Sequence, residues 1–192
     1  MQTYLVSAAL VALAEMGDRT QLLAIMLASR YRAPVPILAG ILAATLANHA
    51  LAALAGFYLS SLLSAPWFRY AVSASFVAMA AWALIPDTAG DEAEGPAPSR
   101  RGVFWTTAIA FFLVEMGDKT QIATAALAAR FHEVIWVAAG TASGMMLANI
   151  PAVWLGERVT RILPMAALRI AAAAVYLILG VLGLAQTAGW IR

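Results

Sequence analysis

The heptad EMGDRTQ at residues 15–21 recurs almost unchanged as EMGDKTQ at residues 115–121. The copies differ only at Arg19 and Lys119, where the positive charge is kept. Both copies lie inside long apolar stretches, where each charged side chain costs roughly a few kcal/mol. The doubled motif therefore indicates a functional site rather than packing, and it divides the chain into two similar halves.

The composition is typical of an integral membrane protein. The chain has 192 residues, of which 63% are hydrophobic and only 11% are charged, whereas soluble domains carry about 25% charged residues. There is no cysteine, which excludes disulfides and thiolate metal sites. The small net charge of +2 comes from basic residues scattered near the ends of apolar segments, so we expect no binding of nucleic acid.

Apolar segments predict six transmembrane helices and a polar linker. The predicted spans are Tyr4–Ala28, Val35–Leu63, Trp67–Ile85, Val103–Ala129, Val134–Leu155 and Met165–Gln186. The first apolar stretch lacks the basic start of a cleavable signal peptide, so we expect it to be the first span. The polar stretch 87–102 is expected to link one three-helix repeat, residues 1–86, to a second one, residues 103–192.

Further residues repeat at the 100-residue offset of the heptads. The repeated pairs are Arg30 and Arg130, Gly40 and Gly140, Gly56 and Gly156, and Arg69 and Arg169. Because three helices per repeat is an odd number, the second copy must enter the membrane from the opposite side. The predicted fold class is therefore an all-α membrane protein with two inverted three-helix repeats, as in many secondary transporters.

Basic residues predict the orientation in the membrane. One set of span ends carries Arg30, Arg32, Arg100, Arg101, Arg158, Arg161 and Arg169, and the other carries Arg69, Arg130 and Arg192. The richer set is expected in the cytoplasm, which places both termini outside it. Tryptophans near the span ends are typical of anchors in the interface between lipid and water; they are Trp67, Trp105, Trp136 and Trp190.

The acids of the heptads lie about midway along their predicted spans, near the bilayer centre. In a continuous helix, a Glu and an Asp three residues apart share one face. Gly17 and Gly117 would permit either close approach of a neighbouring helix or a local break. Inverted symmetry should bring the two copies together at one shared or two adjacent cation sites. The predicted metal-binding residues are Glu15, Asp18, Glu115 and Asp118.

Carboxylate oxygens of this kind suit Ca²⁺, Mg²⁺ or Mn²⁺. The amides of Gln21, Gln121 and Asn149 could supply neutral oxygens, while Arg19 and Lys119 flank the acids. Four ionised carboxylates and two bases would leave a charge of −2, which one divalent cation or two protons would neutralise. This balance is the logic of a cation/proton antiporter.

Other interpretations stay open at this point. Glu15 with Arg19 and Glu115 with Lys119 could be intrahelical ion pairs, four residues apart, although such pairs give the two aspartates no role. A membrane-embedded hydrolase would need an Arg/Ser/His cluster beside the acids, which the heptads lack. A divalent-cation channel is a further alternative. We expect that the protein is not an enzyme and that it uses no cofactor.

The doubled Glu-x-Gly-Asp-(Lys/Arg)-(Thr/Ser) motif resembles the signature of a family of small membrane cation exchangers in the lysine-exporter superfamily. Its members include Golgi manganese/calcium–proton exchangers, a thylakoid manganese transporter and bacterial manganese exporters. The resemblance spans the whole chain and implies that the four acids form the cation site, with Thr20 and Thr120 at the hydroxyl position of the motif. The compact length resembles the bacterial members. The resemblance therefore implies an inner-membrane exporter that exchanges Mn²⁺, or else Ca²⁺, for protons.

Overall fold

The computed structural model describes residues 1–62, 66–85, 100–155 and 165–190. All regular secondary structure in these residues is α-helical. The helices are α1 (Gln2–Glu15), α2 (Arg19–Tyr31), α3 (Pro34–Leu62), α4 (Pro66–Ala83), α5 (Arg100–Glu115), α6 (Lys119–Phe131), α7 (Val134–Leu155) and α9 (Met165–Thr187). Helices α3, α7 and α9 are long and apolar enough to cross a membrane.

Four of the six predicted spans correspond to single helices, namely α3, α4, α7 and α9, with ends that differ by at most two residues. The first and fourth predicted spans do not. Each is interrupted within its heptad, so that α1 and α2 replace the first span and α5 and α6 replace the fourth. The expectation that each Glu and Asp share the face of one continuous helix is therefore wrong. Most of the predicted linker lies outside the described residues.

Glycine conformation accounts for both breaks. Gly17 has a φ angle of 83° and Gly117 has one of 81°, in the left-handed region that residues with a Cβ rarely adopt. A right-handed helix cannot continue through such a residue. Of the two roles that the sequence permits for these glycines, the structure shows the helix break.

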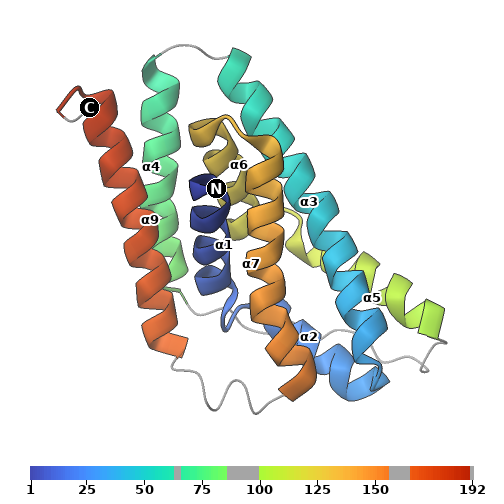
Figure 1. Ribbon diagram of the computed structural model, residues 1–192. Helices are drawn as coiled ribbons and strands as arrows, with labels where there is room; N and C mark the ends of the chain where they lie inside the picture. Colours follow the sequence, from blue (N-terminus) through green and yellow to red (C-terminus); the bar gives the residue numbers. More distant parts are fainter. Residues whose placement is uncertain (63–65, 86–99, 156–164, 191–192) are drawn as a thin grey trace.

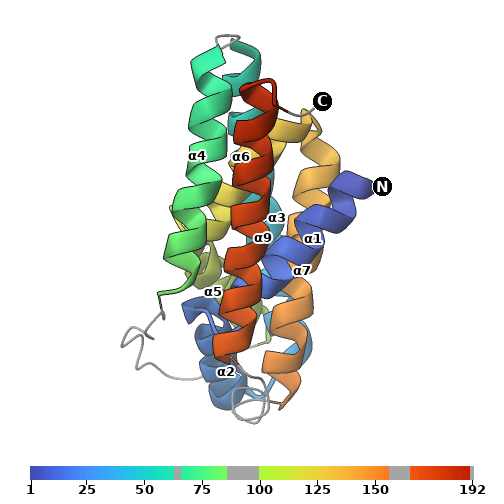
Figure 2. The same ribbon diagram turned by 90° about the vertical axis from the view of Figure 1, so that its left-hand side faces the viewer.

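The interrupted helices lie among the long ones. Helix α1 packs along α7, α5 packs along α3, and α4 and α9 lie side by side. In Figure 1, α2 leads from its break toward the lower end of the molecule, whereas α6 leads toward the upper end. The first residues of α1 and the last of α9 lie toward the same end in Figures 1 and 2. The acids at both breaks are buried in the bundle, whereas Met116 and Gly117 of the second break are exposed.

Two glycines at equivalent positions of the repeats allow close contacts between these helices. A Cβ on Gly40 would lie 2.7 Å from the Phe104 carbonyl oxygen in α5, and one on Gly140 would lie 2.6 Å from the Tyr4 carbonyl oxygen in α1. Both distances are too short for a side chain. The equivalent glycines of α3 and α7 therefore bring each long helix into backbone contact with an interrupted one.

The bundle has an apolar interior and an apolar exterior. Leu10, Phe76, Leu127 and Tyr176 are fully buried in one cluster of α1, α4, α6 and α9. Many large apolar side chains face outward instead; among them are Leu46, Leu51, Ile109, Leu113, Leu147 and Ile178. An exterior of this kind suits lipid contact rather than water, in accord with an integral membrane protein.

Candidate metal centre

Each break places a glutamate at the end of one helix and an aspartate at the start of the next. Glu15 is the last residue of α1, and Asp18 is the N-cap of α2; Glu115 and Asp118 hold the same places in α5 and α6. In both copies the Asp amide donates a hydrogen bond of 3.1 Å to the Glu carbonyl oxygen. The first four residues of each heptad therefore form a tight turn between two helices. This turn directs the side chains of both acids into the bundle.

A glutamine holds each turn. The Gly17 amide donates to Gln21 Oε1 at 2.8 Å, and the Gly117 amide donates to Gln121 Oε1 at 2.7 Å. Gln21 also donates from Nε2 to the Ala148 carbonyl oxygen of α7 at 3.0 Å. The two glutamine oxygens that the sequence suggests as neutral ligands thus accept hydrogen bonds from the backbone of the turns.

Three of the four predicted carboxylates converge. Glu15, Glu115 and Asp118 each offer an oxygen, and these oxygens lie within 4.8 Å of one another. All three side chains are buried. Asp18 is not in this group, but electrostatic interactions link it to both glutamates. Buried carboxylates from two turns, 100 residues apart in sequence, thus form one acidic centre that could hold a metal ion.

The two bases pair across the repeats. Lys119 Nζ lies 2.5 Å from Asp18 Oδ1, and Arg19 Nη2 lies 3.2 Å from Asp118 Oδ1. Arg19 also donates to the Val114 carbonyl oxygen of α5 at 2.9 Å. The alternative of intrahelical pairs between each glutamate and its own base is therefore wrong, because the helix break separates the members of each such pair.

The heptad threonines have different partners. The Thr20 hydroxyl donates to Glu15 Oε2 at 2.7 Å, and Asp18 Oδ2 lies 3.3 Å from the same hydroxyl. The Thr120 hydroxyl lies 3.2 Å from Asp118 Oδ2, which also accepts from the Thr120 amide at 3.3 Å. Thr20 therefore joins the two acids of its copy, whereas Thr120 contributes to the N-cap of α6.

Several buried oxygens at the centre lack a hydrogen-bond donor among the described residues. They include both carboxylate oxygens of Glu115 and Oε1 of Glu15. Buried polar atoms are otherwise almost always hydrogen-bonded. Both glutamates also end their helices, where unpaired carbonyl groups favour a cation. The arrangement is suited to bind a metal ion or protons.

Two further polar groups bear on this centre. Asn149 donates from Nδ2 to the Met145 carbonyl oxygen within α7 at 3.0 Å, while its Oδ1 has no donor among the described residues. Tyr176 of α9 is fully buried, and its hydroxyl has no hydrogen-bond partner among the described residues. Tyr176 was not predicted from the sequence. The available signal was a hydroxyl group in the middle of the apolar part of α9.

Comparison with known families is consistent with this geometry. Residues 3–91 and 103–190 match the family described as divalent cation/proton antiporter GDT1. The chain belongs to the GDT1 family. The resemblance inferred from the doubled heptad is thereby confirmed, and the two matched segments contain one heptad each. Membership of GDT1 identifies a membrane transporter of divalent cations and not an enzyme.

One protein with a similar sequence carries a more specific name. The chain is 46% identical over 180 residues to the "Putative manganese exporter" of Vibrio cholerae serotype O1, strain ATCC 39541 / Classical Ogawa 395 / O395. The match covers 93% of this chain and 88% of the relative. No solved structure matches this GDT1 chain.

Proposed function

We propose that this GDT1 chain exports Mn²⁺ across the bacterial inner membrane in exchange for protons, with Ca²⁺ as the alternative substrate. The convergence of three buried carboxylates from the two helix breaks carries the proposal. The name of the Vibrio relative supports manganese as the substrate. Mn²⁺ is a cation that carboxylate and carbonyl oxygens bind well.

The charge balance of the centre supports exchange for protons. Four ionised carboxylates with Arg19 and Lys119 carry a net charge of −2. A bound divalent cation neutralises this charge, and two protons neutralise it after the cation has left. The cross-repeat ion pairs satisfy Asp18 and Asp118. The two glutamates are therefore the groups that we expect to exchange metal for protons.

We further propose that the fold comprises six spans in two inverted repeats, with α1–α2 and α5–α6 as interrupted spans. Equivalent contacts support this arrangement, because α1 packs on α7 as α5 packs on α3. The reciprocal ion pairs between the heptads also agree with a pseudo-two-fold axis through the centre. Interrupted helices that meet near the midplane are a common way to build a cation site in secondary transporters.

The proposed orientation has both termini outside the cytoplasm. The excess of basic residues at the ends that include Arg30, Arg32 and Arg101 supports it. Fusion of a reporter that is active only in the periplasm to either terminus should give active enzyme. A fusion that is active at one terminus alone would contradict both this orientation and the even number of spans.

Proton-coupled transport can be tested in everted membrane vesicles. Respiration acidifies the vesicle interior, and a pH-sensitive dye reports whether added Mn²⁺ releases internal protons. We expect proton release with the unmodified protein and none with Glu115→Gln, with Glu133→Gln as a control because Glu133 lies outside the centre and is exposed. Mn²⁺ entry without proton movement would contradict the antiport mechanism and favour a channel.

A second measurement in the same vesicles addresses competition. If two protons and one cation compete for the same carboxylates, the apparent Mn²⁺ affinity should weaken as the pH on the loading side falls. The limiting slope should approach two protons per ion. Parallel titrations with Ca²⁺ would separate the two candidate substrates.

A further inference from the structure

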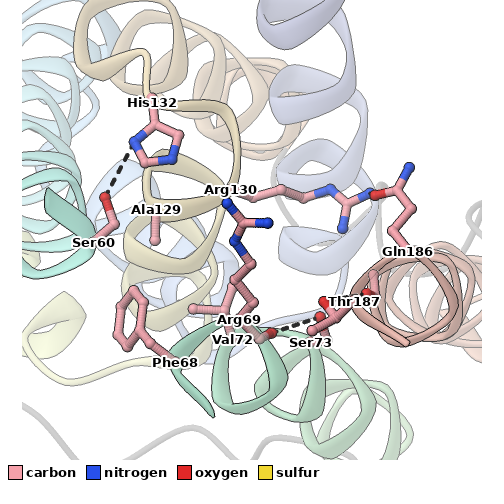
Figure 3. A pocket seen from close by; sticks show the side chains of 11 residues that line it. Ser60, Phe68, Arg69, Val72, Ser73, Ala129, Arg130, His132, Gln186 and Thr187 are labelled. Carbon is pink, nitrogen blue, oxygen red and sulfur yellow. Dashed lines mark hydrogen bonds between the residues drawn. The ribbon is translucent and has the colours of Figure 1, made fainter. Parts of the chain in front are cut away.

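A cavity separate from the acidic centre lies where α3, α6 and α9 end and α4 begins. It has a volume of about 450 Å³ and is lined by the last turn of α3, the first two turns of α4, and the C-terminal ends of α6 and α9. Two arginines line it, Arg69 from α4 and Arg130 from α6, together with His132. Figure 3 shows the arginine side chains extending among α4, α6 and α9. A cavity of this size can hold a small ligand or a headgroup.

Among the described residues, no carboxylate lines this cavity, and none forms an ion pair with Arg69 or Arg130. Within the described part of the chain, the Arg130 guanidinium donates hydrogen bonds to two acceptors, the Leu179 carbonyl oxygen at 3.5 Å and Gln186 Oε1 at 3.3 Å. Both distances are longer than those of typical N–H···O hydrogen bonds. The cavity therefore concentrates positive charge and leaves strong donors available to an anion.

The surrounding backbone is shaped to admit Arg130. A Cβ on Gly183 of α9 would lie 2.7 Å from Arg130 Nη1 and would clash with Ser73 Oγ. Any other residue at position 183 would displace the guanidinium or the buried Ser73. Glycine at this position therefore gives Arg130 access to the space between α6 and α9.

The depth of the cavity matches the headgroup layer of a bilayer. Trp67, next to the start of α4, is 58% exposed, and Trp190, just after α9, is 82% exposed. Exposed tryptophans at helix ends mark the interface between lipid and water. The arginines thus lie at the level where lipid phosphates are found.

From this geometry we propose that the cavity binds an anionic phosphate group, either of an anionic phospholipid headgroup or of free phosphate. Two guanidinium groups recognise phosphate through paired, charge-assisted hydrogen bonds. The bound group would connect α4 and α9 to the end of α6, the helix whose other end carries Lys119 and Thr120. The proposed phosphate site does not depend on manganese or on proton exchange.

The repeat supplies a matched control. Arg30 is the counterpart of Arg130 in the first repeat and lies at the end of α2, where its guanidinium stacks on the Tyr31 ring at 5.6 Å. Arg30→Gln removes an equivalent charge without touching the cavity. Arg69→Gln removes an exposed cavity arginine, and Gly183→Ala perturbs the position of Arg130 without a change of charge.

The test is the thermal stability of the delipidated full chain in neutral detergent. Phosphatidylglycerol, phosphatidylcholine or inorganic phosphate is added, with sodium chloride at matched ionic strength as reference. We expect phosphatidylglycerol to raise the melting temperature more than phosphatidylcholine does. Arg69→Gln and Arg130→Gln should each weaken apparent binding about tenfold or more, Gly183→Ala should weaken it too, and Arg30→Gln should not.

The two sources of phosphate give different results. A shift with phosphatidylglycerol alone identifies the lipid headgroup, whereas a shift with inorganic phosphate in the absence of lipid identifies the free ion. The proposal is overturned if neither stabilises the unmodified protein. It is also overturned if Arg30→Gln weakens binding as much as Arg69→Gln, because the effect would then be general electrostatic attraction.

Discussion

Lys119 forms an ion pair with Asp18, an acid that belongs to the other copy of the heptad. The pair is buried, since Lys119 is 4% exposed and Asp18 is 1% exposed. The reciprocal pair is different, because the Arg19 side chain is 40% exposed. Equivalent positions in the two repeats thus hold one buried and one accessible ion pair around the same acidic centre.

The buried pair should matter more for stability than the exposed one. Removal of Lys119 by Lys119→Gln leaves a buried carboxylate without its base, which costs about 3–5 kcal/mol. Arg19→Gln should cost about 1 kcal/mol or less, because solvent already screens that pair. The free energy of unfolding in mild detergent measures both. The double variant Asp18→Asn/Lys119→Gln should recover most of the loss, and equal losses for Lys119→Gln and Arg19→Gln would contradict this assignment.

Neutralisation of each acid should abolish transport, and for the two glutamates it should do so without destabilising the protein. Glu15→Gln, Asp18→Asn, Glu115→Gln and Asp118→Asn are each expected to remove manganese resistance from cells that depend on this exporter. Glu115→Gln should not lower the melting temperature, because neither of its carboxylate oxygens has a donor among the described residues. Glu133→Gln serves as the exposed control. Near-normal resistance in three of the four variants would rule out the proposed site.

The two heptad threonines should differ in importance. Thr20→Val removes the hydroxyl that donates to Glu15 at 2.7 Å, and loss of such an orienting bond typically weakens metal binding about 10- to 100-fold. Thr120→Val should have a smaller effect, because Asp118 Oδ2 still accepts a hydrogen bond from the Thr120 amide. Mn²⁺ binding to the purified protein measures the difference, with Thr20→Ser as the variant that keeps the hydroxyl. Equal losses of Mn²⁺ affinity in Thr20→Val and Thr120→Val would contradict the different roles proposed for the two threonines.

The contact glycines of α3 and α7 should be equally intolerant of a side chain. Gly40→Ala and Gly140→Ala each place a Cβ within 2.7 Å of a backbone oxygen of α5 or α1. Overpacking of this kind costs about 1–3 kcal/mol. Thermal unfolding in detergent should show similar losses of stability for the two variants, because the glycines occupy equivalent positions in the two repeats. Loss at one glycine alone would show that the two contacts are not equivalent.

The apolar pattern predicted four helices well and two poorly. The lengths of the apolar segments predicted α3, α4, α7 and α9, because a helix that spans a bilayer needs a long apolar segment. The breaks in the other two spans were foreseen only as one of two roles for Gly17 and Gly117. In the sequence, a glycine that permits close helix packing cannot be told from one that adopts a positive φ angle. Only the backbone conformation in the structure distinguishes the two roles.

The site was predictable in kind but not in detail. The doubled heptad predicted that Glu15, Asp18, Glu115 and Asp118 converge, because repeated charges in apolar surroundings rarely persist unless they are paired or bind a ligand. The structure groups all of them except Asp18. It did not predict which base pairs with which acid. The local spacing permitted pairs between each glutamate and the base of its own heptad as one alternative, whereas in the structure each base pairs with the aspartate of the opposite copy.

Composition and local order were sufficient to predict an integral membrane protein, a repeat and a set of candidate cation ligands, because these predictions do not depend on contacts between distant segments. Contacts between distant segments came from the packed bundle alone. Pairing of Asp18 with Lys119 and the meeting of Arg69 and Arg130 in one cavity both join parts of the chain that are far apart in sequence. Such contacts follow from the packing of whole helices, whose positions no local pattern of residues specifies.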